Sequence, residues 1–429
     1  MDKIFRAIDL FAGIGGIRLG FIQAFNDEME FVFSNEIDPY CCQTYEANYG
    51  ENPIGDITKI NPEDIPDFDI LLAGFPCQAF SIAGRKEGFE DTRGTLFYNI
   101  AQILDEKKPN AFLLENVPHL LNHDKGRTFQ VIKDILEEDL NYNIHFTILN
   151  AKDFGLPQNR PRIYIVGFKK NLRFAFPTPT KKRVKLEEIL EQDVDDSYYL
   201  SQQYLNGLKK HRARHEAKGN GFGYLVVPRS GIANAIVCGG MGKERNLVFD
   251  KILVNCWKKD GDDIQLRNNE GIRKMTEREW ARLQGFPEAF TFPVAKTRIY
   301  RQLANSVPIP VIKAIAQEIK RSLENHIVER KPKLNTNEKD AIDLLLTMYR
   351  RKKFTQTGKK TRKSIEAIIK NFALRIENIE EVYKILMNLK LIDQVSDINI
   401  YFEKSLKNIK SEQELRKIFY EIFSVKEHL

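Results

Sequence analysis

The stretch DLFAGIGGIRLGF, residues 9–21, decides the fold class of this chain. An apolar run at residues 4–10, typical of a buried strand, leads into it, and a helical pattern at residues 17–25 follows. Glycines let the backbone turn tightly and approach a ligand closely, and the N-terminus of a helix favours anionic or polar groups. The stretch therefore predicts a strand, a turn and a helix. A turn that binds a ligand and a turn that binds none are both compatible with it.

Strands and helices continue to alternate after this turn. We expect further strands at residues 30–35, 69–75, 111–116 and 162–168, with helices notably at 96–106 and 129–136. Alternation of this kind is typical of a doubly wound, mostly parallel sheet. The sequence therefore predicts an α/β fold.

The texture of the sequence changes after residue 175, where proline, a basic run and two glycine clusters replace the alternation. Helical patterns return at residues 276–283 and 311–323, and a second change follows residue 330. We predict an α/β domain of residues 1–175 plus 293–325, a small irregular domain of residues 176–292, and a mostly helical C-terminal extension of residues 331–429 without an assigned role.

Composition narrows the class of protein. Apolar residues make up 42% of the chain and charged residues 29%, as in globular proteins that are soluble in water. No apolar run approaches the roughly 20 residues of a membrane span, and the N-terminus does not resemble a secretion signal. The five cysteines form no CxxC pair, so we expect neither disulfides nor a metal site. The expected location is the cytoplasm.

Positive charge is concentrated in one segment. Residues 331–363 contain eleven Lys or Arg and three Asp or Glu, a net charge of +8, whereas the whole chain carries +7. A stripe that binds phosphates and a solvated linker fit this charge equally well.

Acidic residues follow the glycine turn where a nucleotide cofactor would need them. Glu36 ends the second predicted strand about twenty residues further on, where an acid can bind ribose hydroxyls. Asp56, in GDI, lies where a third segment can reach an adenine. The absence of a GxGxxG pattern disfavours a nicotinamide-dependent dehydrogenase.

A cysteine and a glutamate follow the next two predicted strands. Cys77 lies in GFPCQAFS, and Glu115 lies in ENV. In a doubly wound sheet both belong to the carboxyl edge, beside the glycine turn. Arg160 and Arg162, in QNRPRIYIVGF, alternate along the last strand, where they can hold a base or phosphate and favour a thiolate.

This set of groups suits chemistry at carbon 5 of cytosine. Adding a thiolate to carbon 6 makes carbon 5 nucleophilic, and a carboxyl group at ring nitrogen 3 stabilises the charge that develops. Carbon 5 can then take a methyl group. A lone cysteine is nevertheless most often a small buried hydrophobe, so the residues by themselves leave both interpretations open.

The ordered motifs favour the catalytic interpretation of the cysteine. Together they resemble the DNA cytosine-5 methyltransferase family, in particular bacterial modification methylases. The matching blocks are DLFAGIGGIRLGF, SNEID, GDI, GFPCQAFSIAG with GFEDTRGTLF, FLLENV, QNRPRIYIVGF, MTEREWARLQGFP and YRQLANSVPIPVI. They cover about residues 5–170 and 275–323 in the family's order and spacing. The resemblance implies a Rossmann-like methyltransferase fold, S-adenosyl-L-methionine as methyl donor and S-adenosyl-L-homocysteine as product.

The resemblance also implies roles for individual residues. Cys77 matches the nucleophile, Glu115 the acid on the base, and Arg160, Arg162 and Gln78 the other catalytic positions. The cofactor-binding positions are Phe11, Gly13, Ile14, Gly15, Glu36, Ile37, Asp56, Ile57, Pro76, Leu96 and Asn305. The family extrudes its target base from the duplex, and Ser81, Arg85, Lys86 and Arg93 lie on the loop expected to close over DNA.

The small domain would then recognise the target sequence, and its two glycine clusters, at residues 219–223 and 239–242, are expected to enter the major groove. Its candidates for phosphate or base contacts are Arg212, Arg214, Arg229, Lys243 and Arg245, although a solvated loop charge is the commoner role of any one of them. The chain departs from the family at Ala83, where some relatives carry a polar residue, and at residues 234–236, where many carry a threonine beside an aliphatic residue.

We therefore expect a monomeric, sequence-specific enzyme that acts on double-stranded DNA and not at a membrane. Its role would be to protect host DNA in a restriction-modification system, with a cognate endonuclease acting on the same site without necessarily touching it. The alternatives are a transfer-RNA methyltransferase of the same fold and a non-catalytic DNA-binding regulator. The intact set of catalytic residues speaks against the regulator, and no cysteine-phenylalanine-threonine block typical of the RNA branch occurs.

Overall fold

The computed structural model describes residues 4–76, 96–180, 183–239, 242–250 and 268–329. A six-stranded sheet forms its centre, in the order β2-β1-β3-β4-β7-β5. These strands are β1 (Phe5–Leu10), β2 (Met29–Asn35), β3 (Ile70–Gly74), β4 (Ala111–Asn116), β5 (Asn143–Asn150) and β7 (Pro161–Phe168). All five strands expected from the sequence are present, and β5 is an additional edge strand.

Strand β7 runs opposite to the other five strands of this sheet. Strands β2, β1, β3 and β4 run parallel, whereas β7 runs antiparallel to β4 and β5 antiparallel to β7. Glu115 of β4 lies opposite Tyr164 of β7. The start of β7 therefore reaches the edge at which the four parallel strands end.

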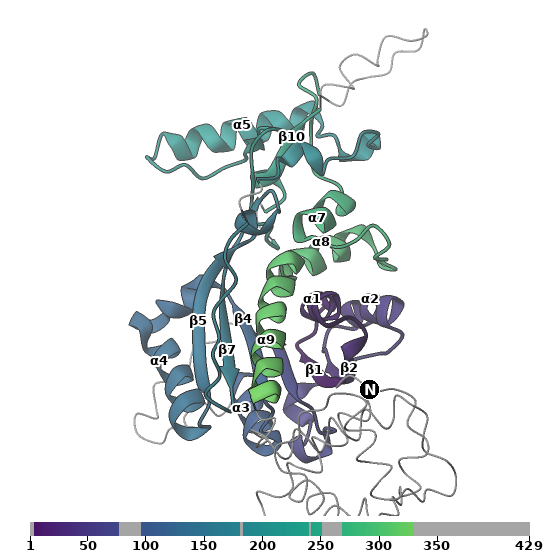
Figure 1. The fold of residues 1–429 in the computed structure, drawn as a ribbon. Coiled ribbons are helices and arrows are strands. Elements are labelled where there is room, and N and C mark those ends of the chain that lie inside the picture. Colours follow the sequence, from purple (N-terminus) through teal and green to yellow (C-terminus); the bar gives the residue numbers. More distant parts are fainter. Residues whose placement is uncertain (1–3, 77–95, 181–182, 240–241, 251–267, 330–429) are drawn as a thin grey trace, which may run out of the picture. The chain divides into compact units, whose positions relative to one another are not determined.

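Helices cover both faces of the sheet (Figure 1), so the doubly wound α/β prediction is confirmed. Helices α3 (Leu96–Lys107) and α4 (Arg127–Asp134) pack on one face, and α1 (Gly16–Phe25) and α9 (Ile309–Glu329) pack on the other. A Cβ atom on Gly20 would lie 2.5 Å from Ile312 of α9, so glycine permits the close contact between these two helices. Helix α2 (Pro39–Tyr49) follows β2.

The described residues between 176 and 276 form short strands and the long helix α5. Helix α5 (Gln202–Glu216) lies with a three-stranded sheet of order β11-β10-β8, made of Ile272–Arg273, Leu247–Phe249 and Val226–Val227. Strand β9 (Ala233–Asn234) pairs with β6 (Gln158–Asn159). Helices α7 (Glu277–Gln284) and α8 (Lys296–Asn305) follow. The sequence analysis missed α5, because only Leu205 and Leu208 of its side chains are buried and its apolar stripe is therefore short.

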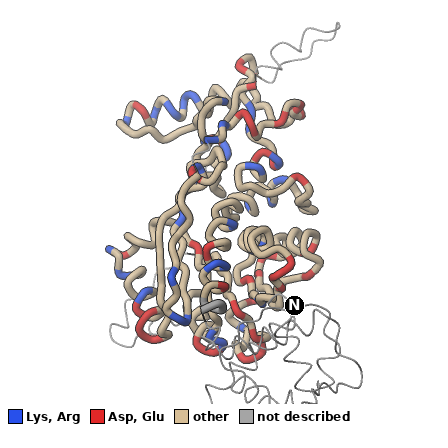
Figure 2. The backbone as a smooth tube through the Cα atoms, in the orientation of Figure 1, with Lys and Arg blue, Asp and Glu red and all other residues tan. Residues whose placement is uncertain are grey.

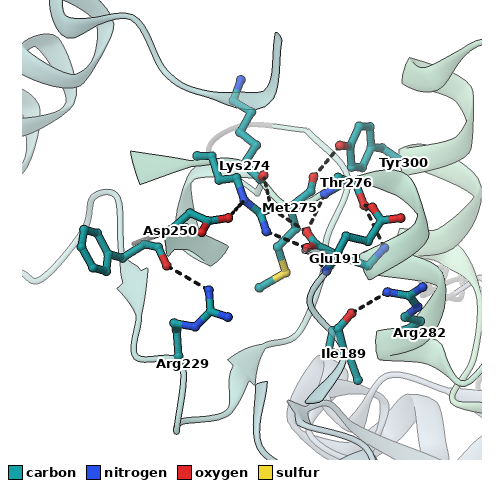
Figure 3. Close-up of polar contacts among 12 residues, drawn as sticks. Ile189, Glu191, Arg229, Asp250, Lys274, Met275, Thr276, Arg282 and Tyr300 are labelled. Atoms are coloured by element: carbon teal, nitrogen blue, oxygen red, sulfur yellow. Dashed lines mark hydrogen bonds and ion pairs between the residues drawn. The ribbon is translucent and has the colours of Figure 1, made fainter. Parts of the chain in front are cut away.

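A buried ionic cluster joins this region to α7. The Arg273 guanidinium is fully buried and pairs with Asp250, at 3.1 Å, and with both carboxylate oxygens of Glu279, at 2.8 Å each. Glu279 also accepts the Thr276 amide in a capping box, and the Thr276 hydroxyl donates to Glu191 (Figure 3). The cluster thus fixes the end of β10, the start of α7 and the segment at residue 191 to one another.

Replacing Arg273 by methionine would leave two buried carboxylates without their cation. Breaking a buried pair in this way costs about 3–5 kcal/mol, and we expect a loss of that size in denaturant unfolding of the Arg273→Met variant. Arg321→Met removes an exposed i,i+3 pair with Glu318 and should cost less than about 1 kcal/mol. Equal losses in the two variants would contradict a structural role for the cluster.

The predicted domain limits at residues 175, 293 and 325 are not tested by these observations and stay predictions. Residues 331–429, expected to form a helical extension, lie outside the described residues.

Candidate active site

The carboxyl edge of the sheet gathers most of the residues singled out in the sequence. The parallel strands β1, β2, β3 and β4 end there, and β7 begins there. Ligands of open α/β sheets bind outside this edge. The glycine turn, Glu36 and Glu115 follow or end three of these strands.

The glycine turn has an unusual backbone. Phe11, Gly13 and Gly15 have φ values of 53°, 57° and 76°, in the left-handed region that side chains rarely adopt. A Cβ atom on Gly15 would lie 2.3 Å from the Tyr49 ring, whose hydroxyl donates to the Gly15 carbonyl. The left-handed Phe11 stores backbone strain of the kind that clusters at ligand sites. Ile14 is buried in a cluster with residues of α7 and α8.

Glu36 connects this turn to the next strand. One of its carboxylate oxygens accepts the Gly13 amide at 2.7 Å, and the other accepts the Asp38 amide at 2.7 Å. Its own backbone amide donates to Pro53, and its carbonyl accepts the Gly55 amide. Glu36 thereby brings the glycine turn and the GDI segment together, and its contact with a ribose stays a prediction.

Two exposed apolar side chains lie beside Glu36 and the GDI segment. Ile37 and Ile54 are 66% and 60% exposed, although both are large apolar side chains. Ile57 is buried. The Asp56 carboxylate accepts the hydroxyl and the amide of Thr58, and these hydrogen bonds lower the pKa of its carboxyl group.

Glu115 forms an ion pair with Arg162 at the end of β4. The Arg162 Nε lies 3.1 Å from a Glu115 carboxylate oxygen, and both side chains are nearly buried. Burial raises the pKa of Glu115, while Arg162 and then Arg160 act in the opposite direction. The neighbouring Asn116 donates to the Phe75 carbonyl at 2.9 Å and so holds the chain just before Pro76, which is exposed. The site thus offers a carboxyl group that can hold a proton.

Arg160 is used differently from Arg162. Its guanidinium is almost fully buried and donates to three backbone carbonyls: Ile236 at 2.8 Å, Ala304 at 2.7 Å and Ser306 at 2.6 Å. Burial lowers the pKa of Arg160 to about 9, with Arg162 adding to the effect. The two arginines therefore do not share one task in this structure, and a contact of Arg160 with a base stays a prediction.

Several predicted residues lie outside the described part of the chain. They are Cys77, Gln78, Ser81, Arg85, Lys86 and Arg93. Leu96, half-buried at the start of α3, and the exposed Asn305 at the end of α8 are described. Asn305 accepts a hydrogen bond from the Cys238 thiol at 3.4 Å.

The five basic candidates of the small domain divide into two groups. Arg214 and Arg245 are exposed, and Lys and Arg residues gather along α5 (Figure 2). Arg212 pairs with Glu216, Arg229 donates to the Phe249 carbonyl, and Lys243 lies 3.8 Å from the centre of the Tyr300 ring. Arg214 and Arg245 are therefore the better candidates for contact with an external phosphate.

Two buried glutamines were missed in the sequence. Gln158 and Gln284 are fully buried and hydrogen-bond backbone groups of distant segments. Gln158 lies in the quoted QNRPR block, but nothing in the sequence indicates which backbone groups its amide would meet.

Comparison with known proteins identifies the chemistry. Residues 5–321 match the C-5 cytosine-specific DNA methylase family. The chain is 52% identical over 328 residues to the type II methyltransferase M.HpaII of Haemophilus parainfluenzae, which covers 75% of this chain and 90% of that protein. The chain belongs to the C-5 cytosine-specific DNA methylase family.

A second relative and a solved structure agree with the assignment of the methylase to this family. It is 50% identical over 327 residues to the type II methyltransferase M.SsoII of Shigella sonnei, covering 75% of this chain and 81% of that protein. The fold resembles the methyltransferase EhMeth of Entamoeba histolytica, with a TM-score of 0.58 and 20% identity over 76% of this chain and 99% of the other. The resemblance to bacterial restriction-modification methylases, found in the sequence, is confirmed. Within the described ranges, no helix of the methylase has the length and apolar character of a membrane span.

A buried polar network lies beneath the glycine turn of the methylase. Asp9, at the end of β1, is buried next to the Tyr45 hydroxyl, which also approaches Ser34. Arg18 pairs with Glu51 and donates to the Tyr45 hydroxyl. Burial raises the pKa of Asp9 to about 8, against the opposing effect of Arg18.

This raised pKa predicts a definite pH dependence of stability. Below the unfolded pKa of 3.8, Asp9 is protonated in both states; as the pH rises towards 8, only the unfolded state loses the proton, and the folded state loses relative stability. Asp9→Asn cannot ionise. The melting temperature of the variant minus that of the unmodified methylase should therefore rise from pH 5 to pH 8 and level off above pH 8. A constant difference across this range would mean that Asp9 is ionised throughout.

Proposed function

We propose that the carboxyl edge of the sheet is the site at which this methylase transfers a methyl group from S-adenosyl-L-methionine to carbon 5 of an extruded cytosine. The observation that carries the proposal is the Glu115–Arg162 pair, which lies at the same edge as the glycine turn and Glu36. The type II methyltransferases that the chain resembles support duplex DNA as the substrate.

The residues around the glycine turn fit this cofactor. Glu36 has further lone pairs on both carboxylate oxygens, although each already accepts one amide, and these can receive ribose hydroxyls. The exposed side chains Ile37 and Ile54 suit the face of an adenine, and Asp56 and Ile57 border it. Phe11, Gly13, Ile14, Gly15, Pro76, Leu96 and Asn305 are the remaining positions we assign to the cofactor. When bound, S-adenosyl-L-methionine supplies an electrophilic methyl group.

The chain's own residues prepare the base for that group. The Cys77 thiolate adds to carbon 6 of cytosine, forming an S–C bond and making carbon 5 nucleophilic. Glu115 holds a proton at ring nitrogen 3, in keeping with the raised pKa of its carboxyl group. Arg162 fixes the Glu115 carboxyl group. Gln78, next to Cys77 in the sequence, supplies a polar contact. After methylation, loss of the carbon-5 proton and departure of the thiolate restore the aromatic ring.

Basic and polar residues outside the catalytic set would hold the DNA while the base enters the site. Arg214 and Arg245 are proposed to contact phosphates or bases, with Ser81, Arg85, Lys86 and Arg93 contributing from the loop after Cys77. We further propose that the methylase acts as a monomer and protects sites that a cognate endonuclease cuts.

A fluorinated substrate tests the nucleophile directly. Fluorine at carbon 5 cannot leave as a proton does, so elimination of the thiol is blocked and the enzyme stays attached to its DNA. With S-adenosyl-L-methionine and duplex DNA amplified with 5-fluorodeoxycytidine, we expect a covalent complex that survives denaturing electrophoresis. Cys77→Ser should form none. Glu115→Gln should form it about 10²–10⁴-fold more slowly, because the proton at nitrogen 3 is lost.

Cys41→Ser is the matched control, since Cys41 is a half-buried cysteine of α2 that has no assigned role. This variant should form the complex at the unmodified rate. Covalent complex with Cys77→Ser would overturn the assignment of the nucleophile, and complex with fluorinated RNA alone would overturn the substrate.

A further inference from the structure

Three buried side chains form a polar junction behind the site. Gln158, Arg160 and Gln284 are each at most 2% exposed, and together we call them the buried junction. Their hydrogen bonds go largely to backbone groups of three segments that are far apart in the sequence: the segment at Ile236, the end of α7, and the turn at residues 303–306.

The junction holds both backbone groups of Ile236. The Ile236 amide donates to the Gln158 side chain at 3.1 Å, and the Ile236 carbonyl accepts Arg160 at 2.8 Å. Strand pairing of β6 with β9 leads directly into this contact. Two residues later, Cys238 is exposed and Gly239 begins the second glycine cluster, which the sequence predicts to enter a DNA groove.

The junction also holds the turn that carries Asn305. Arg160 donates to the carbonyls of Ala304 and Ser306, and Gln284 donates to those of Leu303 and Ser306, at 2.8 and 3.2 Å. Asn305 is exposed between these anchored residues. The turn packs tightly on the glycine turn, because a Cβ atom on Gly16 would lie 2.6 Å from the Ser306 hydroxyl.

Arg160 is the member that bridges both sides. Its planar fork reaches Ile236 with one terminal nitrogen and the turn with the other, so all three bonds form only when both segments are in place. A buried guanidinium with a missing acceptor is costly, so each segment in position favours the other. The Cys238 thiol adds a direct hydrogen bond to the Asn305 side chain.

We propose that Arg160 is a positioning residue that couples DNA binding at residues 237–239 to cofactor binding at Asn305. This inference rests on the proposed function, since it takes the two ligands from there. DNA that holds its segment in this position also favours this position of the turn, so the cofactor binds to a turn that is already in place.

Coupling of this kind is reciprocal and can be measured. If DNA tightens the binding of S-adenosyl-L-homocysteine by a given factor, S-adenosyl-L-homocysteine must tighten DNA binding by the same factor. We expect a factor on the order of tenfold for the unmodified methylase, within the range usual for coupled sites.

The experiment titrates S-adenosyl-L-homocysteine into the methylase with and without a duplex whose target site is unmethylated on both strands. The reverse experiment titrates this duplex with and without S-adenosyl-L-homocysteine. Arg160→Lys keeps the positive charge but lacks the planar fork, and should reduce the coupling factor to about two or less, on the order expected when one of two coupled contacts is lost. Arg162→Lys is the matched control, because Arg162 contacts Glu115 and Pro161 instead. It should lower turnover and keep the full coupling factor.

Gln284→Met provides a second variant that leaves Arg160 intact while removing two bonds to the turn, and it should lower the coupling factor in the same direction. It decides the matter if Arg160→Lys does not fold. Full coupling in Arg160→Lys, or in Gln284→Met where the first variant is not folded, would overturn the inference. Covalent trapping on fluorinated DNA by the unmodified methylase keeps such a result separate from failure of the proposed function.

Discussion

The antiparallel pairing of β7 with β4 is the constraint on which the site depends. Parallel strands alone would bring only their carboxyl ends to the ligand edge. Because β7 runs the other way, its first residues meet the last residues of β4, and Arg162 comes within 3.1 Å of Glu115. Arg160, just before β7, lies between the segment of Ile236 and the turn of Asn305.

Buried charges in this chain have distinct consequences according to their partners. Arg273 is neutralised by two carboxylates and fixes one region to another. Arg160 bonds only neutral carbonyls in the described structure, so its charge is balanced less locally and its position depends on two segments at once. Glu115 pairs with Arg162, and burial raises the pKa of its carboxyl group, which suits a group that holds a proton on a base.

Much of the fold followed from the sequence, because its strands are continuous apolar runs that end at recognisable residues. Strand β4 has the predicted limits, and β1, β2, β3 and β7 begin and end within one residue of prediction. Strand β5 was missed because it lies at the edge, where polar and apolar residues mix. The contacts of Glu36 agree with its predicted place, but they include two backbone amides that no pattern of residue types indicates.

The limits of sequence reasoning are clearest at Arg160 and Arg162. They are two residues apart in the sequence, and both were expected to be able to hold a base or a phosphate. Their different roles arise from long-range partners, Ile236 and Ala304 in one case and Glu115 in the other. Such partners depend on tertiary packing over more than seventy residues of chain for Ile236 and twice that for Ala304. The same reason explains why Gln158 and Gln284 gave no signal.

The most direct test of the whole account is to map where the methyl group goes. Mixed duplex DNA is incubated with the methylase and labelled S-adenosyl-L-methionine, and methylated cytosines are then located by bisulfite sequencing. The account predicts label at carbon 5 of cytosine within one recurring DNA sequence. Label found only in RNA added to the same reaction, or on a base other than cytosine, would contradict it.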